Sequence, residues 1–177
     1  MKAFYFKHLL SFHNPSGTSR GILKQKESWF IVIVQGNKTG IGECSLIKGL
    51  SPDPVKSYEQ ILKTVCENIS DGFENLSLKL NSFPSILFGL ETAFRSFESH
   101  DPLLLFPSAF TKNKDSIAIN GLIWMGEKNF MISQIKEKIN AGFDCIKIKI
   151  GSLDFKTELD IIKNIRKEYS LKNLEIR

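Results

Sequence analysis

Two lysines separated by one residue, Lys147 and Lys149, are the side chains of this sequence best suited to move a proton. They alternate with isoleucines through residues 145–151. Because successive residues of a strand point to opposite faces, both amines are expected on one face. Two neighbouring ammonium groups repel each other, and partial burial acts in the same direction, so the pKa of a lysine in such a site falls toward the range of a general base. The alternative is a half-exposed strand with both lysines in water.

Strand and helix patterns alternate around these lysines, an order that favours parallel strands joined by right-handed crossovers. The isoleucines would then pack against the helices, and a second helix layer over the lysines would bury two charges at high cost. In a barrel the second face is the interior, where polar residues near the C-terminal mouth serve catalysis. The predicted elements are strands at 117–123, 145–150 and 174–177, a helix at 128–141 with Phe130, Met131, Ile135 and Ile139 inward, and a helix on Phe155, Leu159, Ile162, Ile165 and Tyr169.

The first 115 residues follow another pattern, that of an α+β unit. Alternating and β-branched segments predict a three-stranded antiparallel meander, and two apolar stripes at helical spacing follow it. Asp53, just before Pro54, is expected to be the N-cap of the first helix. The predicted domains are therefore 1–115 and 116–177. The predicted elements are strands at 3–9, 29–35 and 39–44, a polar connection at 11–21, and helices at 55–69 and 84–99.

Length and composition limit the function classes. The chain has 177 residues, 24% of them charged, and a net charge of +5, an ordinary balance for a globular protein. The lysines are spread out, so nothing marks a nucleic-acid partner, whereas a positive field suits a small acidic ligand. No apolar run reaches the roughly 20 residues that span a bilayer, no signal peptide is recognised, and the three cysteines are far apart. We therefore expect a cytoplasmic protein without a membrane partner.

A meander, two helices and a barrel whose second strand ends in Lys-x-Lys resemble the enolase superfamily, in particular its muconate-lactonising branch. Within that branch the chain resembles the o-succinylbenzoate synthase family. The resemblance implies an α+β capping domain at 1–115 and the first strands and helices of a (β/α)₇β barrel at 116–177. A whole barrel needs about 200 to 250 residues, so we expect the chain to be truncated. The segments that carry the resemblance are 16–21, 40–45, 119–126 and 147–149.

The resemblance also implies a reaction, the Mg²⁺-dependent syn-dehydration of 2-succinyl-6-hydroxy-2,4-cyclohexadiene-1-carboxylate in menaquinone biosynthesis. Lys149 would take the proton α to the ring carboxylate, and Lys147 would tune it and face the developing oxyanion. Ser19 and Arg20, in a loop that closes over the barrel mouth in this superfamily, would contact substrate. Trp124, at the end of the first barrel strand, is the third expected substrate contact. A mobile polar connection at 16–21 and a plain rim aromatic at Trp124 are the alternatives.

The Mg²⁺ ligands of the family are acidic residues at the ends of the third, fourth and fifth barrel strands, and we expect them beyond Arg177. No residue of this chain is assigned to the metal, and Glu175 lies within a strand, not at its end. Two other functions stay open. One is a dipeptide epimerase or another racemase of the same branch, which shares the Lys-x-Lys motif. The other is an inert capping module that binds a ligand or a partner. The oligomeric state is left open.

Overall fold

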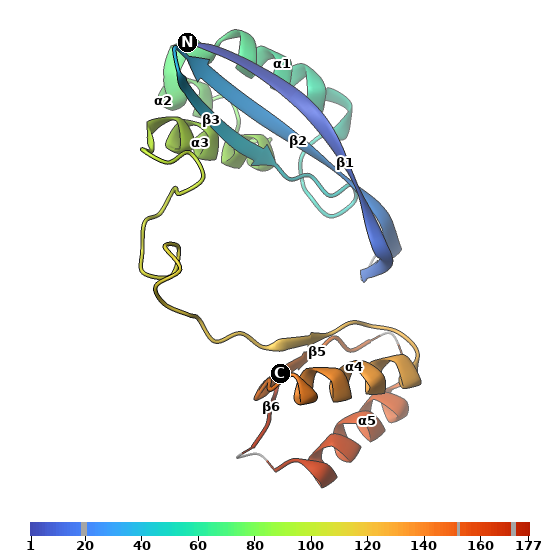
Figure 1. Cartoon of the computed structure of the whole chain (residues 1–177). Helices are drawn as coiled ribbons and strands as arrows, with labels where there is room; N and C mark the ends of the chain where they lie inside the picture. The colour runs from blue at the N-terminus through green and yellow to red at the C-terminus, as the bar shows by residue number, and fades with distance from the viewer. Residues whose placement is uncertain (19–20, 152, 171–172) are drawn as a thin grey trace. The chain divides into compact units, whose positions relative to one another are not determined.

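The chain forms two units, Met1–Asp115 and Ser116–Arg177, each with its own sheet and hydrophobic core (Figure 1). The structure, a computed structural model, describes residues 1–18, 21–151, 153–170 and 173–177. None of the helices among these residues is both long and apolar enough to cross a membrane.

The first unit contains the expected meander, an antiparallel sheet in the order β1-β2-β3. Its first two strands are longer than predicted, because the polar stretch at 11–18 continues β1 along β2 instead of leaving the sheet. Pairing runs down to Thr18 opposite Gly21, with a register shift between Ser11 and Ser16. Backbone ladders do not depend on side-chain polarity, so a polar stretch can remain a strand. The strands are β1 (Lys2–Thr18), β2 (Gly21–Gln35) and β3 (Lys38–Cys44).

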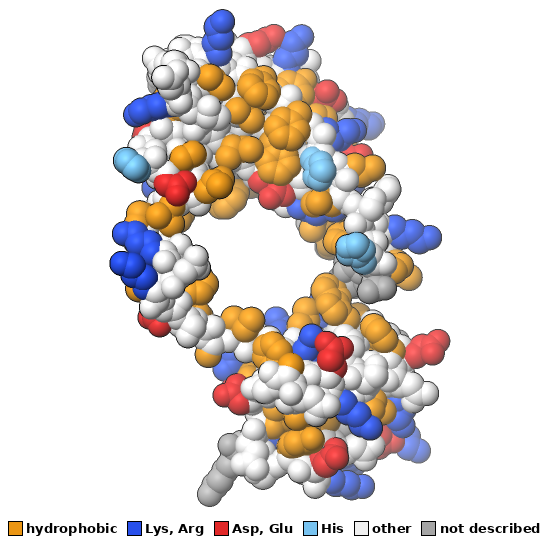
Figure 2. All heavy atoms as spheres, in the orientation of Figure 1, with side chains coloured by type: hydrophobic (Ala, Val, Ile, Leu, Met, Phe, Trp, Pro, Cys, Tyr) orange, Lys and Arg blue, Asp and Glu red, His pale blue; other side chains and the backbone are white. Residues whose placement is uncertain are grey.

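Helices cover one face of this sheet (Figure 1). Ile31 and Ile33 of β2 are fully buried against them, whereas Phe4 and Phe6 on the opposite face stay exposed. Figure 2 shows hydrophobic side chains gathered over the sheet of this unit. The helical segments are η1 (Val55–Ser57), α1 (Tyr58–Glu67), η2 (Ile69–Asp71), α2 (Gly72–Ser77) and α3 (Pro84–Glu98). The short helix α2 was not predicted; it begins at Gly72, which has a φ of +81°, and it buries Leu76.

The glycines of β3 have a packing role. A Cβ at Gly40 or Gly42 would collide with the backbone of α3, and a Cβ at Gly89 of α3 would collide with the Cys44 sulfur. Strand and helix therefore approach more closely than residues with side chains would allow. This contact explains why glycines stand at positions 40 and 42 of β3 and at position 89 of α3.

Asp53 caps a helix other than the one predicted. The start of η1 receives no side-chain cap, and Asp53 instead accepts hydrogen bonds from the backbone N–H and the hydroxyl of Ser85, at 3.0 and 2.7 Å. Ser85 is in the first turn of α3, whose own N-cap position, Phe83, has no side chain able to accept. Tyr58 adds a 2.6 Å hydrogen bond to the Ser85 hydroxyl. Asp53 therefore ties the loop before α1 to the N-terminus of α3.

The second unit has the predicted parallel order of strands, β4-β5-β6. Both of its helices lie on one face of the sheet (Figure 1). The fully buried Ile123, Met131 and Ile146 form the centre of the core between helices and sheet. The elements are β4 (Gly121–Ile123), α4 (Lys128–Asn140), β5 (Cys145–Ile148), α5 (Phe155–Glu168) and β6 (Glu175–Ile176).

Several predicted details of this unit are wrong. Strand β4 starts at Gly121, where pairing with β5 begins, and not at residue 117. The inward face of α5 is also displaced, because one residue turns a helix by about 100° and packing selects Ile161 and Ile165 with Glu158. Five apolar side chains expected in the core or in a strand are exposed: Ile117, Ile119, Phe130, Ile150 and Phe155.

We expect Asp53→Ala to lower the free energy of unfolding of the first unit by about 1 to 3 kcal/mol, because it leaves the N–H and the hydroxyl of Ser85 without their buried acceptor. Denaturation followed by the fluorescence of the buried Trp29, in a Trp124→Phe background, measures this. Asp71→Ala is the matched control, because the exposed Asp71 makes no side-chain cap to α2. Equal stability of the two variants would contradict the cross-helix cap.

Candidate active site

Lys147 and Lys149 lie at the C-terminal end of β5. Ile146 and Ile148 pack into the core beneath α4 and α5, so the lysines between and after them are excluded from that core. Lys147 is exposed and Lys149 is half-buried. Although β5 ends at Ile148, the Lys149 N–H still donates to the Ile123 carbonyl at 3.4 Å. The backbone of Lys149 is therefore still aligned beside β4.

Trp124 and Lys149 are brought together by these two strand ends. The Lys149 ammonium lies 4.1 Å from the centroid of the Trp124 ring, a cation–π contact. Trp124 is 40% exposed, so the pair is open to solvent on one side. Trp124 was predicted from the sequence as a substrate contact, and that role remains a prediction. Its contact with the lysine is a feature that the sequence analysis missed.

The backbone of Trp124 is held by α4. The Gln134 side chain accepts a hydrogen bond from the Trp124 N–H at 3.0 Å, and its amide nitrogen donates to the Trp124 carbonyl at 3.2 Å. A side-chain amide thus replaces the strand partner at the point where β4 has ended. Only the packing of α4 against β4 could reveal this, because ten residues separate the two in the sequence.

The loop after Lys149 is held by α5. Gly151 adopts a φ of +98°, a conformation that favours glycine, and its N–H donates to the Glu158 carboxylate at 2.7 Å. The N–H of Leu153 donates to the same oxygen at 3.1 Å. Glu158 is 8% exposed, which is unusual for a glutamate and is compensated by these donors. Sequence analysis missed Glu158; its position in the first turn of a helix after a glycine loop was the available signal.

Asp154 begins α5 as its N-cap. Its carboxylate accepts from the Thr157 N–H at 3.0 Å and from the Thr157 hydroxyl at 2.6 Å. The hydroxyl bond is the main reason that the pKa of Asp154 is lowered from its ordinary value. The loop after the lysines is therefore fixed at its end by the helix itself.

On the sheet face that carries Lys147, strand β6 contributes one carboxylate, that of Glu175, which is already paired with an arginine. Glu175 accepts a hydrogen bond from Arg177 at 2.7 Å. Among the described residues, no three His, Cys, Asp or Glu side chains come together as a metal site would require. The side chains that the structure describes thus do not fit a Mg²⁺ ion, which needs oxygen ligands in near-octahedral geometry.

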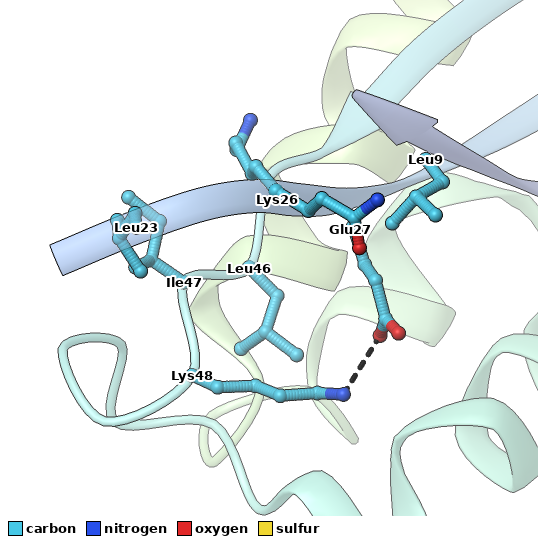
Figure 3. A pocket seen from close by; sticks show the side chains of 8 residues that line it. Leu9, Leu23, Lys26, Glu27, Leu46, Ile47 and Lys48 are labelled. Atoms are coloured by element: carbon cyan, nitrogen blue, oxygen red, sulfur yellow. Dashed lines mark ion pairs between the residues drawn. The ribbon is translucent and has the colours of Figure 1, made fainter. Parts of the chain in front are cut away.

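Two of the predicted site residues, Ser19 and Arg20, lie outside the described residues. Next to them in the sequence, the hairpin of the first unit borders a pocket of about 260 Å³. Leu9, Leu23 and Leu46 provide apolar walls, and Lys48 pairs with Glu27 at 2.9 Å (Figure 3). This hydrogen bond lowers the pKa of Glu27 from its ordinary value, with a smaller contribution from Lys7. The pocket was not predicted from the sequence.

Two polar side chains of β2 contact a carboxylate of β3. Ser28 is fully buried and donates to Glu43 at 2.7 Å, and Lys26 pairs with the same carboxylate at 3.1 Å. The serine bond is the main cause of a lowered pKa for Glu43. These contacts join β2 to β3 beside the segment at 40–45 that carries the family resemblance.

No family model matches the chain. A curated o-succinylbenzoate synthase from Desulfotalea psychrophila is 33% identical over 208 aligned positions, which cover 100% of this chain and 56% of that protein. The chain matches the N-terminal portion of an o-succinylbenzoate synthase. It spans little more than half the length of this relative.

Solved structures agree with the sequence match. MenC from Desulfotalea psychrophila has a TM-score of 0.79 at 28% identity, over 100% of this chain and 56% of that one. The o-succinylbenzoate synthase of Thermosynechococcus elongatus, complexed with Mg, has a TM-score of 0.74 at 15% identity, over 100% and 51%. A dipeptide epimerase from Methylococcus capsulatus has a TM-score of 0.75 at 12% identity, over 99% and 52%. The last two show the fold alone. The fold predicted from the sequence, which begins with the capping domain of enolase-superfamily proteins, is confirmed by the two matches from Desulfotalea psychrophila.

We expect the stability of the first unit to fall with acid partly through Glu27. A carboxylate whose folded pKa is lowered contributes stability above its unfolded pKa, near 4.5, and loses that contribution as the pH falls through the lower folded value. The free energy of unfolding, followed by Trp29 fluorescence, is measured at pH 6 and at a series of pH values below about 4.5. Between these conditions Glu27→Gln should lose less of this free energy than the unmodified chain, with a difference under about 1 kcal/mol. Glu59→Gln is a control on the exposed surface. Identical acid profiles for Glu27→Gln and the unmodified chain would contradict this role.

Proposed function

We propose that this chain is the N-terminal portion of an enzyme that dehydrates 2-succinyl-6-hydroxy-2,4-cyclohexadiene-1-carboxylate to o-succinylbenzoate in menaquinone biosynthesis. The observation that carries the proposal is the 33% identity to an o-succinylbenzoate synthase along the whole chain. The position of Lys149 supports it, because catalytic groups of barrel enzymes lie at the C-terminal ends of strands.

Lys149 is the proposed base. Its neutral amine takes the proton on the ring carbon next to the carboxylate, and the electron pair left behind expels hydroxide from the neighbouring carbon. The hydroxide leaves as water with a proton that Lys149 returns, so that the ring becomes aromatic and the lysine is regenerated. Lys147, exposed on the same strand, faces the carboxylate as negative charge develops on it. Ser19, Arg20 and Trp124 are the proposed substrate contacts.

Mg²⁺ is the proposed cofactor of the reaction. One matched o-succinylbenzoate synthase was solved with Mg in its active site. When bound, such an ion acts as a Lewis acid toward carboxylate oxygens. The described part of this chain does not offer its ligands, and we propose that residues outside the chain hold it.

The proposed partner is a small acidic substrate, in keeping with the net charge of +5. Neither nucleic acid nor a membrane is part of the proposal. The proposed location is the cytoplasm, because all three cysteines are free thiols. Cys44 and Cys66 are buried, and burial raises the pKa of Cys66 to about 11, as expected of inert core thiols.

Dipeptide epimerisation is the second candidate function. The Methylococcus capsulatus epimerase is as similar in structure as the Thermosynechococcus elongatus synthase, and a Lys-x-Lys strand suits both reactions. We favour dehydration because the chain is 33% identical to a synthase, whereas it is 12% identical to this epimerase. An inert capping or binding module is the candidate from another class, and it would show neither activity.

In the full-length protein, we expect Lys149→Ala to lower the dehydration rate constant about 10³-fold, which is typical for loss of a general base. The assay follows formation of the aromatic product by absorbance, with dipeptide epimerisation measured in parallel. Lys163→Ala, at an exposed position of α5, is the matched control and should retain full activity. Near-normal turnover by Lys149→Ala would refute the base, and epimerisation without dehydration would favour the second candidate.

We also expect residues 1–177 alone to be inactive at any Mg²⁺ concentration, because their described part does not bring three metal-binding side chains together. The same absorbance assay, with purified chain and millimolar Mg²⁺, measures this. Turnover that is abolished by a chelator would show that the chain holds a metal by itself and would overturn the proposed division of the site.

A further inference from the structure

The Lys149 side chain is long and has four rotatable bonds, so its ammonium is located only if its surroundings fix it. A misplacement of about 1 Å in a reacting group can cost about 100-fold in rate. In this chain the ammonium lies 4.1 Å from the centroid of the Trp124 ring. The contact joins two strand ends, each of which has just left the sheet. The side chains that hold the ends of β4 and β5 in place therefore determine where the ammonium lies.

Gln134 holds the first end. Strand β4 stops at Ile123, and from Trp124 onwards the backbone needs new partners for its N–H and carbonyl groups. The Gln134 amide supplies both, with one acceptor and one donor directed at the same residue. Two hydrogen bonds to one residue fix its orientation as well as its position. The direction of the Trp124 ring is consequently set from α4.

Glu158 holds the second end. One oxygen of its carboxylate accepts hydrogen bonds from the N–H groups of Gly151 and Leu153, two and four residues after Lys149. Hydrogen bonds to an ionised acceptor are about twice as strong as those between neutral groups. Because Glu158 is buried on α5, Gly151 and Leu153 are attached to a helix. The direction in which the chain leaves Lys149 is thus set from α5.

We propose that Gln134 and Glu158 are positioning residues that together place the Lys149 ammonium on the face of Trp124. Neither acts on substrate; each fixes the backbone from which one partner of the contact projects. Their relevance to catalysis rests on the proposed function of Lys149. The placement itself does not, and it can be measured without turnover.

The test is solution NMR of the 177-residue chain with labelled lysine and methionine. Protons above an indole ring are shifted upfield, so the Lys149 ε-methylene signal should be displaced from those of exposed lysines. Trp124→Leu should remove this displacement, which also assigns the signal. Gln134→Ala and Glu158→Ala should each remove at least half of it. Glu158→Gln, which keeps a carbonyl oxygen at the same place, should restore most of it.

Two internal references separate positioning from general loosening. The methyl signal of Met131, fully buried in the core of the same unit, should not move in any of these variants. Glu168→Gln, at an exposed position on α5, should leave the Lys149 signal unchanged. Gln134→Glu keeps the acceptor and loses the donor, so it should reduce the displacement even if Gln134→Ala fails to fold.

Three results would overturn the proposal. The first is a Lys149 signal without upfield displacement in the unmodified chain. The second is a displacement that survives in both alanine variants. The third is a loss that occurs only together with a change in the Met131 signal, which would mean that the side chains stabilise the unit as a whole.

Kinetics of the full-length protein keep this proposal separate from the proposed function. Glu158→Ala should lower kcat about 10- to 100-fold with little change in KM, and Glu158→Gln should recover most of it. If Lys149→Ala retains activity, the proposed base is wrong, yet the NMR result still decides whether Gln134 and Glu158 position the lysine. If KM rises in Glu158→Ala while kcat is unchanged, Glu158 serves substrate binding, and its positioning of Lys149 has no part in catalysis.

Discussion

The burial of Ile146 and Ile148 beneath α4 and α5 is the contact on which the candidate site depends. A strand has two faces and its side chains alternate between them, so packing the isoleucines on the helices leaves the lysines on the other side. A slip of one residue would exchange the two sets and place two charges in an apolar core. The register of β5 against β4, with Lys147 opposite Leu122, is therefore fixed by hydrophobic burial and not by the lysines themselves.

The helices do more than cover the sheet. Each sends one polar side chain past the core to the point where a strand ends: Gln134 to Trp124, and Glu158 to Gly151 and Leu153. Strand ends have backbone groups without ladder partners, and a buried environment makes each missing hydrogen bond costly. The same need appears in the first unit, where Asp53 reaches the N-terminus of α3. In both units, polar side chains supply hydrogen bonds at the ends of helices or strands.

The sequence was a good guide to whatever depends on local pattern. The meander, the helix at Pro84–Glu98, the parallel order of the second unit and the enolase-superfamily fold all follow from periodicity, glycine and proline positions, and motif resemblance. It was a poor guide to where patterns stop. Ile117, Ile150 and Phe155 are apolar residues at plausible core spacing, yet they are exposed, because burial depends on which neighbour arrives from elsewhere in the chain.

By itself, the sequence determined that two lysines share a strand face and that this strand lies between two helices. Only the tertiary structure decided that Trp124 lies beneath Lys149, that Asp53 caps α3, and that Glu158 is buried. The physical reason is the range of the interactions. Alternation and helical periodicity act between residues a few positions apart, whereas caps, cation–π contacts and buried carboxylates join elements whose separation is set by packing. The types of residue were therefore readable in advance, and their partners were not.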